Sequence, residues 1–234
     1  MDNWLTATQA SVLRAAADPL VVDLGYGATA VTTVELADRL RRVRPDVRVV
    51  GIEIDRERVT AAAGWADPPR LDFRHGGFEM GGLRPVIVRA ANVLRQYEEA
   101  AAARAWRNMT AALADGGVLV EGTCDEIGRR SAWVLLDTDG PRTLTLAAKV
   151  DDLPRPGALA ERLPKALIHR NVPGEPIHRF LGALDAAWDA AAPRSTFGPR
   201  QRWIAMCSAV AGEWPVDVRR ARHAEITVAW DAVH

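Results

Sequence analysis

The strongest structural signal in the chain is LVVDLGYGATA, residues 20–30. Its first five residues form a short apolar run rich in valine, which predicts a buried strand. Gly25 and Gly27 then supply the flexible backbone that a sharp turn needs. Apolar residues recur at helical spacing over residues 31–40. A strand, a glycine turn and a helix in this order predict the start of a βαβ unit.

The same alternation continues on both sides of this stretch. Apolar segments at 47–54, 71–74, 86–88 and 118–121 predict further buried strands. Helical patterns cover residues 4–17, begin again at Asp55, and return over 97–114. Strands that alternate with helices predict an α/β fold, with a doubly wound, mainly parallel sheet.

The pattern changes after about residue 124. Apolar runs at 132–137 and 143–150 are joined by a hairpin-like Thr-Asp-Gly-Pro turn, and residues 151–176 are rich in proline. Two helical stripes follow, and residues 225–230 predict a last strand. We expect an antiparallel strand near the C-terminus and extra C-terminal helices. The chain is expected to form one domain, 1–234, with halves of about 1–124 and 125–234.

Composition excludes several classes of protein. Thirty basic and thirty acidic residues give a net charge of zero, so no overall field attracts nucleic acid or an anionic membrane. Two distant cysteines, Cys124 and Cys207, fit neither a disulfide framework nor a structural zinc site. No apolar stretch approaches the roughly 20 residues of a membrane span, and no signal peptide is visible. These features predict a cytoplasmic protein without a metal site.

The glycine turn indicates a site for an adenosine cofactor. The spacing Gly25-x-Gly27-x-x-Ala30 satisfies a dinucleotide-binding pattern, and Glu53 ends the second strand, where a carboxylate binds ribose hydroxyls. On these residues alone, NAD and S-adenosylmethionine (SAM) both fit. Asp23 favours SAM, because a carboxylate beside the turn repels a diphosphate and suits a cationic ligand. Asp23 could instead hold the loop by accepting backbone hydrogen bonds.

Several segments together resemble the class I SAM-dependent methyltransferase family. Residues 22–27, VDLGYG, resemble its first motif, and residues 51–55, GIEID, resemble the second, whose acid binds the ribose. Asn92-Val93-Leu94 and residues 114–119 resemble the fourth motif and the approach to the fifth strand. The resemblance covers about residues 5–123. It implies a Rossmann-like fold, SAM as cofactor, and an acceptor face formed by residues 125–234.

The chain departs from the family pattern at three places. Thr29 replaces a third glycine, Gly77 stands where an aspartate often bonds the adenine amine, and Pro85 replaces an acid. Adenine is then expected to contact backbone groups, with Phe78 as an apolar wall. Arg89 could pair with the carboxylate of the cofactor, or with Asp23 or Glu121. The residues expected to bind the cofactor are Asp23, Gly25, Tyr26, Gly27, Thr29, Glu53, Ile54, Gly77, Phe78, Arg89 and Asn92.

The resemblance implies methyl transfer from SAM to an unidentified acceptor, and we expect a small molecule. The alternatives are an RNA methyltransferase, an NAD-dependent oxidoreductase, and a non-catalytic protein that binds SAM or a partner. Transfer to a good nucleophile needs alignment and desolvation, without a catalytic triad or metal. No general base can be assigned. The weak candidates are His75, Asp125, Glu126, His169 and His178.

Overall fold

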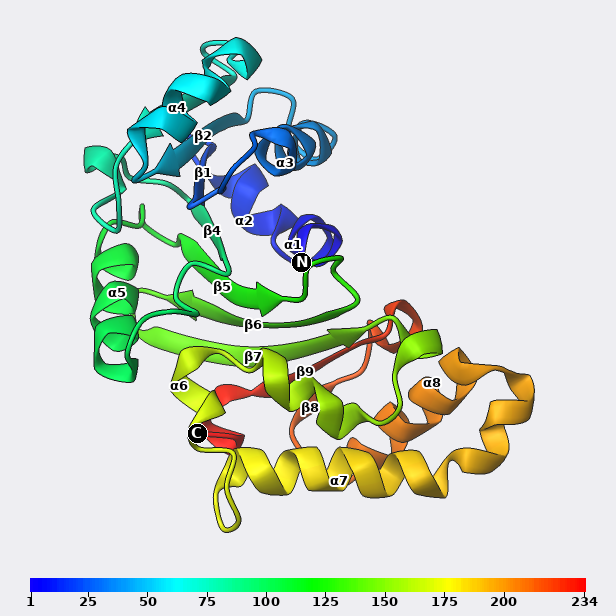
Figure 1. Cartoon of the computed structure of the whole chain (residues 1–234). Coiled ribbons are helices and arrows are strands. Elements are labelled where there is room, and N and C mark those ends of the chain that lie inside the picture. Colours follow the sequence, from blue (N-terminus) through cyan, green and yellow to red (C-terminus); the bar gives the residue numbers. More distant parts are fainter. The chain divides into compact units, whose positions relative to one another are not determined.

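The computed structural model describes residues 1–234, which form two compact units. The first unit contains residues 1–121 and 135–140, and the second contains 122–134 and 141–234. Three strands have residues in both units: β5 (Val118–Cys124), β6 (Arg130–Asp137) and β7 (Gly140–Ala148). Figure 1 traces all the elements of the chain.

The first unit is built on parallel strands. These are β1 (Leu20–Leu24), β2 (Arg48–Glu53), β3 (Leu71–His75) and β4 (Ile87–Ala91), followed by β5. Their order is β3-β2-β1-β4-β5, and β1 pairs in parallel with both β2 and β4. The chain therefore reverses its direction across the sheet between β1 and β4, which is where such sheets bind ligands. This topology confirms the predicted Rossmann-like, doubly wound fold.

Burial explains why these segments form strands. Every residue of β1 is buried, and Val22 lies between Val50 of β2 and Val88 of β4. A strand covered on both faces needs apolar side chains in both directions, so its sequence is a continuous apolar run. Full burial of each of these side chains contributes about 1.5–3 kcal/mol. Strand β1 ends at Leu24, as the sequence predicts.

Two helices precede β1 in the first unit, and three follow its strands. They are α1 (Asp2–Thr8), α2 (Ala10–Ala15), α3 (Val31–Arg41), α4 (Arg56–Ala62) and α5 (Glu99–Ala111). From β1 to β3 the chain moves toward one edge of the sheet, and from β4 to β5 it moves toward the opposite edge. Because such crossover connections are right-handed, α3 and α4 cover one face of the sheet and α5 covers the other. Asp55 caps α4 by accepting from Glu57 N–H at 2.9 Å, at the residue where the sequence predicts that this helix begins. The single helix predicted over 4–17 is wrong, because Gln9 (φ −104°, ψ 11°) leaves the helical conformation between α1 and α2.

The second unit contains antiparallel strands. Besides parts of β5, β6 and β7 it has β8 (Val216–Asp217) and β9 (Glu225–Ala229), and β9 pairs antiparallel with both β7 and β8. Thr145 and Thr227 face each other in the β7–β9 pair, and their hydroxyls are 2.8 Å apart. The predicted antiparallel strand near the C-terminus is therefore confirmed. The two-residue β8 has no apolar pattern that would predict it.

Helices pack on one another in the second unit. They are α6 (Lys165–Ile168), α7 (Pro176–Ala190) and α8 (Pro199–Val210). The apolar stripe of α7 buries Phe180 and Leu184, and α8 buries Trp203, which confirms the extra C-terminal helices. Short 3-10 segments lie in the first unit at Ala63–Trp65 and Met80–Gly82, and in the second unit at Val150–Asp152, Pro156–Arg162, Ala192–Phe197, Ala221–His223 and Trp230–Ala232. None of the helices has the length and apolar character needed to cross a bilayer.

Candidate functional site

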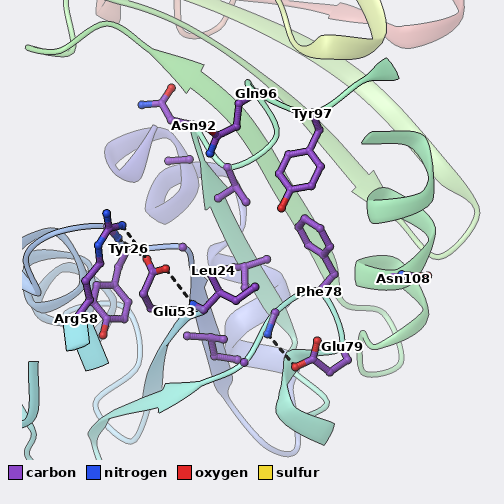
Figure 2. A pocket seen from close by; sticks show the side chains of 18 residues that line it. Leu24, Tyr26, Glu53, Arg58, Phe78, Glu79, Asn92, Gln96, Tyr97 and Asn108 are labelled. Carbon is purple, nitrogen blue, oxygen red and sulfur yellow. Dashed lines mark hydrogen bonds and ion pairs between the residues drawn. The ribbon is translucent and has the colours of Figure 1, made fainter. Parts of the chain in front are cut away.

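A pocket of about 620 Å³ opens at the carboxyl ends of β1, β2 and β4 in the first unit. Its volume lies in the range of small-molecule sites. Figure 2 shows its side chains converging from the strand ends and the loops that follow them. It is lined by Leu24, Gly25, Tyr26, Gly27, Ile52, Glu53, Ile54, Arg58, Gly76, Gly77, Phe78, Glu79, Ala91, Asn92, Val93, Gln96, Tyr97 and Asn108.

The glycine turn forms one wall of this pocket. Gly25 (φ +67°) and Gly27 (φ +84°) both adopt left-handed backbone conformations, which residues with a Cβ atom rarely adopt. Gly25 N–H donates to the Ile52 carbonyl at 2.7 Å, so the turn is bonded to β2. A Cβ atom on Gly25 would lie 2.7 Å from Cγ2 of Val93. The turn therefore needs glycine at position 25 for both conformation and space.

Glu53 places a carboxylate directly beside the turn. It is only 5% exposed, and its Oε2 accepts a hydrogen bond from Gly27 N–H at 3.0 Å. Its Oε1 accepts from Ile54 N–H at 2.9 Å, and the Arg58 guanidinium lies 3.7 Å from Oε2. Backbone N–H donors fix the direction of the side chain and stabilise its negative charge. A buried anion held in this way presents acceptor lone pairs to a ligand in the pocket.

Asp23 does not line the pocket, so its predicted electrostatic role is wrong. It is 2% exposed, and Arg89 donates to both of its oxygens, from Nε to Oδ1 at 2.9 Å and from Nη2 to Oδ2 at 2.6 Å. The Thr33 hydroxyl also donates to Oδ2 at 2.6 Å. A carboxylate neutralised by a buried guanidinium projects little field into the pocket. The choice between SAM and NAD must therefore depend on other residues.

Arg89 lies outside the pocket as well, which corrects its predicted role toward the cofactor carboxylate. Besides Asp23, it donates from Nη1 to Asp2 of α1 at 2.8 Å and from Nη2 to the Thr32 carbonyl at 3.2 Å. Burial acts to lower the pKa of Arg89, but the charges and hydrogen bonds of Asp23 and Asp2 outweigh it and raise the pKa. Of the pairings left open by the sequence, the structure shows the one with Asp23.

Tyr26 lines the pocket, but its ring also supports the turn from the side of β2. The ring meets Phe73 edge to face, with centroids 5.3 Å apart, and lies against Gly51. Its hydroxyl is buried and has no hydrogen-bond partner. Burial, followed by the charge of Glu53, raises the pKa of Tyr26 to about 12. The phenol therefore stays protonated and acts as a packing group.

The opposite side of the pocket comes from the loops after β3 and β4. The rings of Phe78 and Tyr97 meet edge to face at 5.5 Å, and Gly77 lies beside Phe78. Asn92, at φ +61°, leads out of β4 into the same wall. In Figure 2 the Tyr97 hydroxyl points toward Phe78, and Gln96 and Asn92 lie beyond it. This side combines aromatic and amide side chains, so it suits a flat, partly apolar ligand group.

The structure places eight of the eleven predicted cofactor residues in the lining of the pocket. The three that lie outside it are Asp23, Thr29 and Arg89. Thr29 is exposed and lies two residues before α3 begins at Val31. The sequence did not single out several lining residues whose side chains are polar or aromatic. These are Arg58, Glu79, Gln96, Tyr97 and Asn108.

None of the weak candidates for a general base lines the pocket. His75 ends β3, and the Oδ1 atom of Asp125 accepts from Arg129 N–H at 2.6 Å within a loop. The Nδ1 atom of His178 lies 3.2 Å from the side-chain oxygen of Asn171. No group of three or more His, Cys, Asp or Glu side chains is arranged to hold a metal ion.

Sequence comparison does not place the chain in a family. No protein-family model matches it, and no curated protein matches it.

Solved structures do match part of the chain. Magnesium protoporphyrin IX methyltransferase from Synechocystis, with bound S-adenosylhomocysteine (SAH), is 18% identical, with 53% of each chain covered and a TM-score of 0.41. Human N-acetylserotonin methyltransferase, in complex with SAM, is 22% identical, with 53% of this chain and 37% of that chain covered and a TM-score of 0.37. A structure described as a pericyclic reaction enzyme is 18% identical, with 50% and 30% covered and a TM-score of 0.40.

The chain thus spans about half or less of the length of these three structures. At these sequence identities and TM-scores, the matches do not establish a function for this chain.

Proposed function

We propose that this protein is a SAM-dependent methyltransferase that acts on a small-molecule acceptor. The observation that carries the proposal is the position of the pocket relative to α3. Gly25, Gly27 and Glu53 line it, whereas residues 28–31, which lead into the first turn of α3, do not. The pocket therefore offers a ribose-binding carboxylate and a glycine turn, without the helix N-terminus that a diphosphate uses.

Glu53 adds a second argument against a dinucleotide. Its carboxylate accepts from Gly27 N–H at 3.0 Å, so the backbone donor inside the glycine turn is already bound to an anion. A diphosphate at this turn would lose that donor and meet the negative charge of Glu53. SAM carries no phosphate, and the hydroxyls of its ribose are donors that suit the free lone pairs of Glu53. The residues present therefore fit SAM better than NAD.

The chemistry required of the protein is modest. Bound SAM would supply a methyl group activated by its sulfonium, and in-line attack on that carbon by a nucleophile of the acceptor would break the C–S bond and release the sulfur as the thioether of SAH. The chain then has to align the two reactants and exclude water. The glycine turn and Glu53 would hold the adenosine end, and the wall formed by Phe78, Tyr97 and Asn92 would close the opposite side. The zero net charge of the chain favours a small acceptor over RNA.

Calorimetry with SAM, SAH and NAD tests this function. We expect SAM and SAH to bind and NAD to show no heat of binding. Glu53→Gln is expected to weaken SAM binding about 10- to 100-fold, because hydrogen bonds to a charged group contribute about 1.5–3 kcal/mol. Glu57→Gln is the matched control, since Glu57 is an exposed residue of α4 outside the pocket.

Two results would contradict the proposal. One is binding of NAD without binding of SAM or SAH. The other is unchanged SAM affinity in Glu53→Gln, in a variant whose urea unfolding midpoint matches that of the wild type. Transfer of methyl label from SAM to a compound in a metabolite extract would separate an active enzyme from a protein that only binds the cofactor.

A further inference from the structure

Charge is distributed unevenly over the lining of the pocket. The lining contains three charged side chains, Glu53 at the end of β2, Arg58 of α4, and Glu79 in the loop after β3. The ends of β1 and β4, and the loops that follow them, contribute no charged side chain to it. Figure 2 shows Asn92 and Gln96 together, apart from the three charged side chains. The part of the pocket over β1 and β4 is therefore neutral.

The charged residues of β1 and β4 do not change this, because they neutralise each other. Asp23 is the only charged residue of β1, and Arg89 is the only one of β4. The register of the two strands places these residues opposite each other, and their side chains form two hydrogen bonds, at 2.9 and 2.6 Å. Neither side chain lines the pocket. Asp23 is therefore not available to a ligand ammonium, and Arg89 is not available to a ligand carboxylate.

The backbone of the glycine turn is also largely occupied. Gly25 N–H donates to the Ile52 carbonyl at 2.7 Å, and Gly27 N–H donates to the Glu53 carboxylate at 3.0 Å. The side chain of Val93 lies over Gly25, since a Cβ atom at position 25 would be 2.7 Å from its Cγ2 and 3.6 Å from its Cγ1. An apolar side chain from the loop after β4 thus covers the turn that follows β1.

The order of the strands decides which end of a nucleoside meets the neutral part. Glu53 ends β2, which lies between β3 and β1 in the sheet. The apolar side chains that suit a flat base, Ile54 and Phe78, follow β2 and β3, so a base extends toward β3. The substituent on the ribose 5′ carbon then extends the other way, toward β1, β4 and Val93. In SAM and SAH this substituent ends in an amino-acid tail with an ammonium and a carboxylate.

Charged groups that enter a neutral site lose hydration and gain no opposite charge in return. We propose that the pocket recognises the 5′-thioadenosine part of its ligand, and that the amino-acid tail adds little to affinity because Val93 and the Asp23–Arg89 pair leave it no charged partner. A 5′-thioadenosine with an uncharged 5′ substituent is then a ligand of the same site. This inference rests on the proposed function, because it takes the natural ligand to be SAM or SAH.

The test is calorimetry of SAH and of 5′-methylthioadenosine, which carries a methyl group on sulfur where SAH carries the tail. A tail with both charged groups hydrogen-bonded would favour SAH about 100-fold or more, because each such bond contributes about tenfold or more. We expect the wild type to favour SAH less than about tenfold. Val93→Ala removes the methyl groups that cover Gly25, so the preference for SAH should rise about threefold or more as the tail reaches the turn backbone. Val31→Ala, at an exposed position of α3 outside the pocket, is the matched control.

Different results separate this inference from the proposed function. If the wild type binds neither ligand, both are wrong. If it favours SAH by tenfold or more, the inference is wrong and the function stands. Binding of 5′-methylthioadenosine without SAM or SAH would support the inference and contradict the function. An unchanged preference in Val93→Ala, with a wild-type urea midpoint, would show that Val93 does not limit the tail. The wild-type comparison needs no variant, so it decides the inference even if Val93→Ala does not fold.

Discussion

Arg89→Met tests the buried charge cluster behind the glycine turn. Methionine matches the unbranched apolar stem of the arginine side chain but lacks the guanidinium. In the wild type the guanidinium nitrogen atoms lie 2.6–2.9 Å from the oxygens of Asp23. Removal of one partner of a buried ion pair costs about 3–5 kcal/mol, because the other charge stays buried without its counterion. Asp23 would keep the Thr33 hydroxyl at 2.6 Å. We therefore expect a loss of about 3 kcal/mol in the free energy of unfolding.

The assay is urea unfolding at pH 7, followed by far-UV circular dichroism. Arg39→Met is the matched control. Arg39 also binds Asp2, at 3.1 Å, but its side chain is 35% exposed, and such pairs contribute less than about 1 kcal/mol. The double variant Arg89→Met with Asp23→Asn removes both buried charges and should be more stable than Arg89→Met alone. A loss of unfolding free energy in Arg89→Met no larger than that in Arg39→Met, or no recovery on adding Asp23→Asn, would contradict this prediction.

Three further predictions concern buried groups of the first unit. Burial raises the pKa of Glu121 to about 7, against a smaller opposite effect of Trp106. Folding stability should therefore fall as the pH rises from about 4.5 to 7, by about 3 kcal/mol, and urea midpoints of Glu121→Gln should lack this fall. Gly51→Ala should destabilise the fold by about 1–3 kcal/mol in urea unfolding, because the new Cβ atom would lie 2.7 Å from Phe73, and an unchanged midpoint would contradict this. Tyr26→Phe should leave the thermal midpoint unchanged or raise it, because the buried hydroxyl has no partner to lose, and a fall of several degrees would reveal one.

The sequence predicts the first unit well because its signals are local. The apolar run and the two glycines of residues 20–27 specify β1 and the turn with no information from elsewhere in the chain. Glu53 is predicted for a similar reason, since a carboxylate that closes a buried strand requires hydrogen-bond donors. In the structure it finds them at Gly27 and Ile54.

The partners of Asp23 could not be predicted in this way. Arg89 lies 66 residues later in the chain, and Asp2 reaches Arg89 from the N-terminal helix. The place of Asp23 in the sequence, two residues before the glycine turn, does not show whether its carboxylate faces the ligand or the protein interior. Glu79 was missed because a loop without periodicity places it in the pocket, and Tyr97 because the helix predicted over 97–114 begins only at Glu99, which leaves Tyr97 in the preceding loop. For these side chains, tertiary packing alone decides the direction in which they point.

Gly51 links three positions whose volumes depend on one another. The space that its side chain would fill is occupied by the rings of Phe73 and Tyr26. A larger residue at position 51 would therefore be tolerated during evolution only if one of these rings became smaller. We expect positions 26, 51 and 73 to vary together among homologous sequences. Tyr26, between the two glycines of the turn, can therefore keep its large ring only while position 51 in the neighbouring strand β2 stays small.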